Sequence, residues 1–188
     1  MKVRIEVSAR HVHLTQHDLE ILFGEGYKLK AEKDLSQGGE FSSFDTLTLV
    51  GPKRKIEGVR VLGPCRNITQ VELSKSDAVY LGVNAPIRLS GKVIGSGPIK
   101  LIGPKAELDL EQGAIVAKRH LHCSPTQASK LALKNGENVK IKIDGQRALV
   151  FGEVEVRLAD NFDLSVHLDT DEGNSAGLGR EGGEGEII

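Results

Sequence analysis

One six-residue pattern occurs twice in this chain and constrains its fold more than any other feature. Residues 10–15 read Arg-His-Val-His-Leu-Thr, and residues 119–124 read Arg-His-Leu-His-Cys-Ser. Four of the six histidines lie in these two copies. On a β-strand, alternate side chains point to the same face, so the two imidazoles of each copy can reach one metal ion. The repeat predicts two similar halves and a metal-dependent site, with purely structural histidines as the alternative.

The repeat extends beyond the histidines. Lys2 to Val7 alternates as a strand and runs straight into the first copy. Thr15 and Ser124 are suited to cap helices, since Asp18 follows Thr15 by three residues and Pro125 suits a first helical turn. The expected ends of these helices are Gly24 and Asn135-Gly136. Each copy is therefore predicted to be a strand, the His-x-His pair, a hydroxyl cap and a short helix.

Most of the remaining chain has β character. The expected strands, rich in Val, Ile and Leu, are Thr46–Val50, Ile56–Leu62, Ala78–Val83, Ile87–Leu89, Ile99–Ile102, Ala114–Ala117, Val139–Ile143, Ala148–Phe151 and Val154–Leu158. Gly-Pro, Asn-Gly and Asp-Gly steps separate them, and many short strands with such turns favour small barrels. We predict a mainly β protein of two barrel-like halves, residues 1–90 and 91–188, between which the chain can cross. The Gly- and Glu-rich tail, residues 177–186, is expected to be mobile.

Composition excludes several classes of function. The net charge of −1 gives no basic field for nucleic acid, and the absence of Trp argues against a platform for stacking bases. The two cysteines, Cys65 and Cys123, have no CxxC spacing, which favours a reducing compartment without disulfides. No apolar run approaches the length of a membrane span, and the first residues do not resemble a signal peptide. We therefore expect a cytoplasmic protein with neither a nucleic-acid nor a membrane partner.

Each His-x-His pair needs a third ligand to make a catalytic zinc site, which typically has three protein ligands and one open position. His167 lies on an alternating stretch that ends in an acidic turn, and it is a natural third ligand for one pair. For the other pair we expect Glu72, which stands among apolar residues where a charge needs a partner. The alternative for Glu72 is an exposed position on an edge strand.

Other residues have weaker signals. Arg66 follows a Gly-Pro turn and could bind phosphate or carboxylate, although such an arginine is more often a solvated loop residue. Cys123 is expected to pack, and His17 is expected to be exposed. The acidic residues 169, 171 and 172 lack the spacing of a calcium loop and are expected to orient His167 or to close a turn.

Four segments, in order, give the chain a specific resemblance. SARHVHLT, GVRVLGPCRNITQVELS, AKRHLHCSP and VHLDTDEGNSAG closely resemble the PduL-type phosphate propanoyltransferases, the phosphotransacylases associated with bacterial microcompartments. The resemblance covers nearly the whole chain. It implies two β-barrel domains related by a pseudo-twofold axis, with a di-zinc site between them. It also implies the interconversion of acyl-CoA and phosphate with acyl phosphate and coenzyme A, propanoyl- or acetyl-CoA being the substrate.

The resemblance also implies roles for individual residues. His11, His13 and Glu72 would hold one zinc ion, and Arg66 would bind the phosphate. The second ion would be held by His120, His122 and His167. Many members carry an N-terminal extension that targets them into a shell, whereas this chain starts at its first strand; a location inside a microcompartment is therefore left open beside the cytoplasmic one.

Two other readings are compatible with the residues. One is a di-zinc hydrolase, in which a bridging hydroxide attacks the substrate, although no aspartate is obviously placed to bridge two ions. The other is a non-catalytic metal-bound scaffold. The sequence leaves open the acyl chain preference, the residues that bind coenzyme A, self-association into a homo-oligomer, the native metal and the physiological direction.

Overall fold

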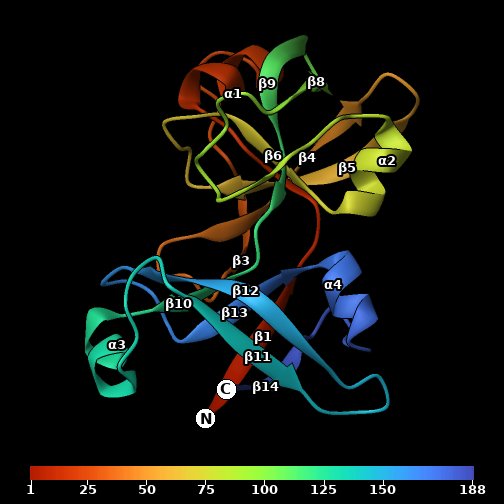
Figure 1. The fold of residues 1–188 in the computed structure, drawn as a ribbon. Coiled ribbons are helices and arrows are strands. Elements are labelled where there is room, and N and C mark those ends of the chain that lie inside the picture. Colours follow the sequence, from red (N-terminus) through yellow and green to blue (C-terminus); the bar gives the residue numbers. More distant parts are fainter. The chain divides into compact units, whose positions relative to one another are not determined.

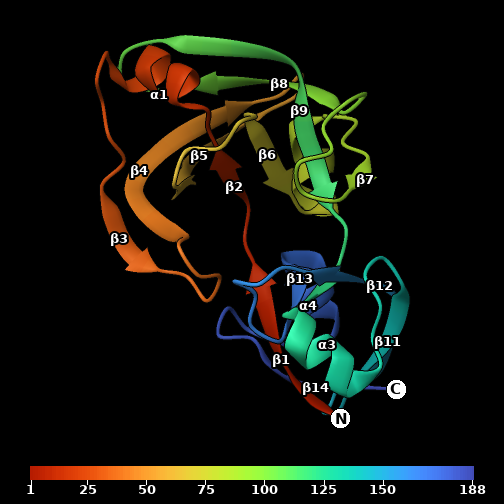
Figure 2. The same ribbon diagram turned by 90° about the vertical axis from the view of Figure 1, so that its left-hand side faces the viewer.

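The chain forms two compact units, each built around its own ring of β-strands. The computed structural model describes all 188 residues. Arg10–Ala117 make up one unit, called here the first barrel, and Met1–Ala9 with Lys118–Ile188 make up the other, the second barrel. Figures 1 and 2 show the strands of each unit, with short helices outside them. The prediction of a mainly β fold with two small barrels is confirmed.

The first barrel is a ring of six strands that closes on itself. The order is β4–β5–β2–β6–β9–β8, and β8 pairs again with β4. The strands of this ring are β2 (His11–His13), β4 (Phe41–Val50), β5 (Lys55–Gly63), β6 (Gln70–Leu73), β8 (Gly97–Ile102) and β9 (Glu107–Ala117). Two further strands, β3 (Ala31–Asp34) and β7 (Ile87–Arg88), pair at its margins, and its helices are α1 (Gln16–Phe23) and α2 (Lys75–Leu81).

The second barrel is also a closed ring of six strands, in the order β1–β13–β10–β12–β11–β14. Its strands are β1 (Lys2–Ser8), β10 (His120–Cys123), β11 (Asn138–Ile143), β12 (Leu149–Leu158), β13 (Ser165–Asp169) and β14 (Gly183–Ile187). Its helices are α3 (Pro125–Leu131) and α4 (Thr170–Ser175). The two segments predicted as separate strands at 148–151 and 154–158 are one strand, β12.

The two rings have the same topology. Each His-x-His strand is parallel to one neighbour (β2 to β5, β10 to β12) and antiparallel to the other (β2 to β6, β10 to β13). The next strand along each ring is again parallel: β9 beside β6, and β1 beside β13. The rings therefore repeat strand for strand, as the two copies of the sequence motif predict.

The chain crosses between the barrels just before each His-x-His pair. Strand β1 belongs to the second barrel but runs into β2 of the first, and β9 of the first barrel runs into β10 of the second. The compact units consequently do not coincide with the predicted ranges 1–90 and 91–188. The physical reason is that β1 fills the place between β13 and β14, a long-range pairing that local sequence does not reveal.

The middle residue of each His-x-His pair anchors its strand in a barrel core. Val12 and Leu121 are fully buried, in two separate apolar clusters. Because side chains alternate on a strand, the two histidines of each pair lie on the face opposite these anchors. The first core includes Val61, Leu73 and Leu101, and the second includes Ile5, Ile141 and Val166.

Side-chain caps begin the helices directly after the His-x-His pairs, as predicted. Thr15 Oγ1 accepts a hydrogen bond from the backbone N–H of Asp18 at 3.0 Å, and Gly24 caps the end of α1. Ser124 and Gln127 form a capping box at the start of α3, with Pro125 in the first turn. Helix α3 ends at Ala132, earlier than the expected Asn135-Gly136.

The prediction of a strand over Ala78–Val83 is wrong. Most of these residues lie in helix α2, which ends at Leu81 and is capped by Gly82. Ser74 and Asp77 form a capping box that starts the helix, and Gly82 ends it with φ 77°. A capping box supplies hydrogen-bond acceptors for two backbone N–H groups, which in a strand would need acceptors on a neighbouring strand. Local capping therefore outweighs the β propensity of the Val and Tyr residues in this segment.

The expectation of a mobile tail is also wrong. Strand β14 closes the second barrel by pairing with β1 and β11. A Cβ atom at Gly185 would lie 3.0 Å from side-chain atoms of both Ile5 and Ile141. The glycine at this position therefore permits close packing inside a narrow barrel, which composition alone cannot distinguish from disorder.

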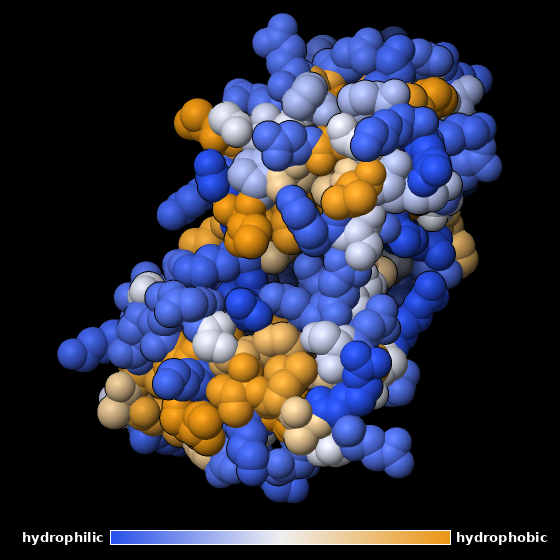
Figure 3. Space-filling view, turned by 45° about the vertical axis from the view of Figure 1, so that its right-hand side comes forward, coloured by the Kyte–Doolittle hydropathy of each residue, from blue (hydrophilic) through white to orange (hydrophobic).

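None of the helices is long and apolar enough to cross a bilayer. Figure 3 shows one face on which hydrophilic residues surround several apolar patches.

We expect Gly185→Val to destabilise the protein by about 1–3 kcal/mol, because the added side chain must enter the space occupied by Ile5 and Ile141. The control is Glu184→Val, which places the same side chain at an exposed position and is expected to change stability by about 0.5 kcal/mol or less. Urea unfolding of the two variants tests this. Equal effects at the two positions would contradict the packing of β14.

Candidate metal centres

The first cluster joins the His-x-His pair of β2 to a carboxylate on β6. In the antiparallel register, His11 lies directly opposite Glu72. Glu72 Oε2 is 3.6 Å from His11 Nε2, and Glu72 Oε1 is 3.8 Å from His13 Nε2. All three side chains are buried. One ligand atom from each lies within 4.8 Å of the others, so the three could hold a single metal ion.

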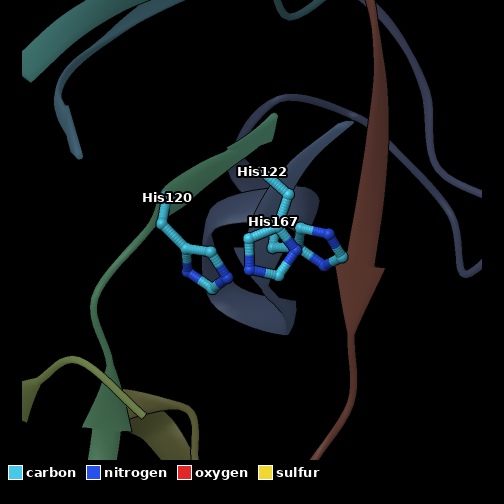
Figure 4. A group of neighbouring side chains, drawn as sticks. All are labelled: His120, His122 and His167. Atoms are coloured by element: carbon cyan, nitrogen blue, oxygen red, sulfur yellow. The ribbon is translucent and has the colours of Figure 1, made fainter. Parts of the chain in front are cut away.

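The second cluster repeats this arrangement with a third histidine. His120 of β10 lies opposite His167 of β13 in the same register. The ring centroid of His167 is 5.1 Å from that of His120 and 4.5 Å from that of His122. Figure 4 shows the three imidazoles gathered beside the ends of these strands. Their ligand atoms also lie within 4.8 Å of one another.

The structure therefore brings together both sets of ligands that the sequence suggested. Glu72 is buried on a strand paired on both sides, by β2 and β9, so the alternative of an exposed edge position does not hold. His17, which the prediction set aside, is exposed on α1.

Electrostatics in the first cluster favour a bound cation. Burial, with the charges of His11 and Arg66, lowers the pKa of His13 to about 2, against the raising effect of Glu72. Burial works against ionisation of Glu72, but its histidine neighbours hold its pKa below the ordinary range. A neutral His13 imidazole beside an ionised Glu72 carboxylate is the pair of protonation states that metal ligation requires of these two groups.

The donor set and its surroundings fit a zinc ion. Two histidines with a carboxylate, or three histidines, are ligand sets of catalytic zinc sites. Nδ1 of His13 is buried without a hydrogen-bond partner, and such a polar atom costs free energy unless something binds it. Nδ1 of His120 contacts the carbonyl of Lys118 at 2.8 Å, an interaction that orients the ring.

Gln70 and Ser165 are neighbours of the third ligands that sequence reasoning missed. The fully buried Gln70 donates from Nε2 to Glu72 Oε1 at 2.6 Å and to Ser90 Oγ at 2.7 Å. Ser165 Oγ lies 3.0 Å from Nε2 of His167. Each stands two residues before its ligand on the same strand face, which is the signal that could have indicated them.

The two clusters differ in where their carboxylate lies. On the other side of Glu72 the paired residue is Ile115, whereas the residue paired with His167 is Glu6. Glu6 Oε2 is 4.0 Å from Nδ1 of His167. A carboxylate is thus part of the candidate ligand set in the first barrel and lies beside the candidate ligand set in the second.

Arg66 lies next to the first cluster. Its backbone N–H donates to the carbonyl of Leu14 at 2.8 Å, one residue after His13. Its guanidinium donates to Ser90 Oγ at 3.0 Å and to Glu40 Oε1 at 2.6 Å. The side chain is partly buried, and both the backbone N–H and the guanidinium of Arg66 are hydrogen-bonded, unlike those of a solvated loop arginine.

Neither cysteine has the environment of a nucleophile. Cys123 is buried in the second core, Cys65 packs against the first, and both are free thiols. Burial raises the pKa of both thiols, which keeps them protonated.

The acidic residues after His167 form the start of helix α4 and not a metal loop. Asp169 caps the helix by accepting from the backbone N–H of Glu172 at 2.8 Å. Burial and the neighbouring Asp169 raise the pKa of Glu172 to about 7, although Arg119 lies 3.2 Å away.

These features define a class: a two-barrel protein in which each barrel gathers three side chains that could hold a metal ion. Comparison with known proteins then supplies the family, since a family model described as phosphate propanoyltransferase matches residues 4–179. A phosphate propanoyltransferase of Lachnoclostridium phytofermentans is 51% identical over 175 residues, which cover 93% of this chain and 82% of that protein. One of Thermotoga maritima is 49% identical, covering 93% and 83%, and one of Salmonella typhimurium is 44% identical with the same coverage. The chain belongs to the phosphate propanoyltransferase family, whose members are phosphate acyltransferases.

Each cluster is expected to bind one divalent transition-metal ion, with Zn²⁺ as the probe. After treatment with a chelator, we expect the wild-type protein to take up two Zn²⁺ ions, and His13→Ala or His122→Ala to take up one. The control is His17→Ala, which removes an exposed histidine and should still bind two. Metal analysis after gel filtration gives the stoichiometry. The same uptake by all four proteins would contradict both centres.

The raised pKa of Glu172 predicts a pH-dependent stability. Between its ordinary value of 4.5 and about 7, the native protein keeps a proton that the unfolded chain has released, so the free energy of unfolding falls as pH rises. Glu172→Gln removes the titrating carboxyl group and with it this dependence on pH. We expect the stability of the variant relative to wild type to rise between pH 5 and 8, by about 1–2 kcal/mol after allowance for partial exposure. Denaturant unfolding at the two pH values measures it, and parallel pH profiles would contradict the shift.

Proposed function

We propose that this protein is a zinc-dependent phosphate acyltransferase that interconverts acyl-CoA and phosphate with acyl phosphate and coenzyme A. The observation that carries the proposal is the pair of three-ligand clusters, one of them with a partly buried arginine beside it. Propanoyl- and acetyl-CoA are the proposed substrates. They differ by one methylene, which is worth only about 1 kcal/mol in a pocket, so both are expected to react.

The metal ligands follow from the clusters. His11, His13 and Glu72 would hold one zinc ion, and His120, His122 and His167 the other. Zinc bound there supplies a Lewis acid that can polarise the thioester carbonyl or accept the departing thiolate. Gln70 holds the carboxylate of Glu72 in place through its amide.

Arg66 is proposed to bind the attacking phosphate. Its planar guanidinium matches the oxygens of phosphate, and its charge offsets the repulsion between two anionic substrates. In the structure the same guanidinium is paired with the carboxylate of Glu40. A phosphate oxygen would therefore take the place of a carboxylate oxygen on Arg66.

The proposed reaction is direct transfer in a ternary complex. A phosphate oxygen attacks the thioester carbonyl, the carbon–sulfur bond breaks, and coenzyme A leaves as the thiolate. The environment of the cysteines supports this route, since both thiols are protonated and packed against apolar cores. The resemblance to microcompartment enzymes adds the proposal that the protein works within or beside such a shell.

The decisive measurement is release of coenzyme A from acetyl- and propanoyl-CoA, with and without phosphate, on protein of known zinc content. We expect release only with phosphate. Release without phosphate would favour the hydrolase reading, and no release from fully loaded protein would favour the scaffold reading. Exchange of labelled coenzyme A into acyl-CoA without phosphate would contradict direct transfer.

Arg66→Ala is expected to lower kcat/KM for phosphate by about 10²–10³-fold with zinc content unchanged, because the charge that binds the phosphate is lost. Arg54→Ala is the matched control, since Arg54 contacts the ring of the exposed Tyr80. Steady-state kinetics with varied phosphate give the comparison. A similar loss in both variants would refute a specific role for Arg66.

A further inference from the structure

The arginine that precedes each His-x-His pair has no role in the proposed reaction, yet it is repeated with the histidines. Arg10 directly precedes His11, and Arg119 directly precedes His120. A second repeat lies on the other side of each cluster. An acidic residue follows the third ligand by five positions in both barrels, as Asp77 after Glu72 and as Glu172 after His167. The structure joins these two repeats.

In the first barrel, one carboxylate makes two kinds of contact. Nε and Nη2 of Arg10 both lie 2.9 Å from Oδ1 of Asp77. The other oxygen, Oδ2, accepts from the backbone N–H of Ser74 at 3.4 Å, within the capping box of α2. Asp77 is buried. The carboxylate therefore links the His-x-His strand to a cap that stands two residues after Glu72.

The second barrel repeats this linkage with different residues. Nη1 of Arg119 lies 3.2 Å from Oε1 of Glu172. The other oxygen, Oε2, accepts from the backbone N–H of Asp169 at 3.1 Å, within the capping box of α4. Asp169 stands two residues after His167. The same division between the two oxygens occurs although the acid is Asp in one barrel and Glu in the other.

The linkage acts where the ligand-bearing strands are short. Strands β2 and β6 pair at three positions, and so do β10 and β13. A metal site needs its ligand atoms within about 0.2 Å of ideal distances, which so short a ladder does not secure by itself. The contact between the arginine and the acidic residue adds a lateral tie between the first candidate ligand and the third. Because the side chains of Arg10 and Arg119 are 41% and 31% exposed, these contacts are expected to add little net stability, and their contribution is to the geometry.

A phosphate-binding role fits Arg10 and Arg119 poorly. The reaction uses one phosphate, and the arginine proposed to bind it occurs in one barrel only. The position equivalent to Arg66, six residues before the third ligand, is Asn161 in the second barrel. A residue repeated in both barrels serves something that is itself repeated, and the metal cluster is such a feature.

We propose that Arg10 and Arg119 are positioning residues, each of which ties its His-x-His strand to the cap behind the third ligand and so sets the spacing of the metal ligands. The inference rests on the proposed binding of metal by both clusters. It assigns Asp77 and Glu172 as the partners through which the two arginines act.

The test measures Zn²⁺ affinity one site at a time. His122→Ala leaves only the first cluster and His13→Ala only the second, so each background reports a single site by competition with a chromophoric chelator. We expect Arg10→Gln to weaken Zn²⁺ binding about 10–100-fold in the His122→Ala background and to have little effect in the His13→Ala background. Arg119→Gln should show the reverse. Arg10→Lys, which keeps the charge but loses the two-nitrogen contact, should recover part of the affinity.

The crossed design separates positioning from general destabilisation. A purely structural role would lower the stability of the metal-free protein but leave the Zn²⁺ affinity of the folded protein unchanged, and that result would overturn the proposal. Equal losses in both backgrounds would overturn it too. In otherwise wild-type protein saturated with Zn²⁺, Arg10→Lys should leave the KM for phosphate unchanged, and a raised KM would instead assign Arg10 to the substrate.

The wild-type control separates this inference from the proposed function. If the wild-type protein binds two Zn²⁺ ions and the arginine variants bind them equally well, the inference alone fails. If the wild-type protein binds no Zn²⁺, the metal assignment fails and the inference falls with it. Should Arg10→Gln not fold, Arg119→Gln and Arg10→Lys give the same test independently.

Discussion

The antiparallel register between each His-x-His strand and its ligand-bearing neighbour is the constraint on which the rest of the structure depends. It places His11 opposite Glu72 in one barrel and His120 opposite His167 in the other. Because alternate residues face opposite sides of a strand, a slip of one residue would turn every ligand toward the apolar core. The fully buried residues between the histidines oppose such a slip, since their burial holds the register that the metal ligands need.

The two barrels share one arrangement of strands, but they differ in the charges and the residues around the two clusters. Equivalent strands pair in the same order and direction, and equivalent arginines meet equivalent helix caps. The carboxylate belongs to the candidate ligand set in the first barrel, as Glu72, and lies beside a candidate ligand in the second, as Glu6. Arg66 has no counterpart.

Local rules predicted much of the fold. Alternation identified the strands around both histidine pairs, and hydroxyl caps identified the starts of α1 and α3. The wrong predictions arose where two local signals competed, or where a strand distant in the sequence determined the conformation. The capping box of Ser74 and Asp77 outweighed β propensity in α2. In β14, Gly185 meets the packing limits of a narrow barrel, although a glycine-rich tail is ordinarily a sign of disorder.

The sequence by itself determined the types of metal-binding side chain, their positions on strand faces, the caps that follow them and the family resemblance. Its spacing could not say which third ligand meets which pair, that β1 belongs to the second barrel, or that Asp77 is the partner of Arg10. The resemblance assigned the third ligands to their pairs, the tertiary structure places them opposite one another, and only the tertiary structure decided the other two points. The physical reason is that alternation and capping act over a few residues, whereas cross-strand partners are chosen by the closure of a ring whose strands lie far apart in the chain.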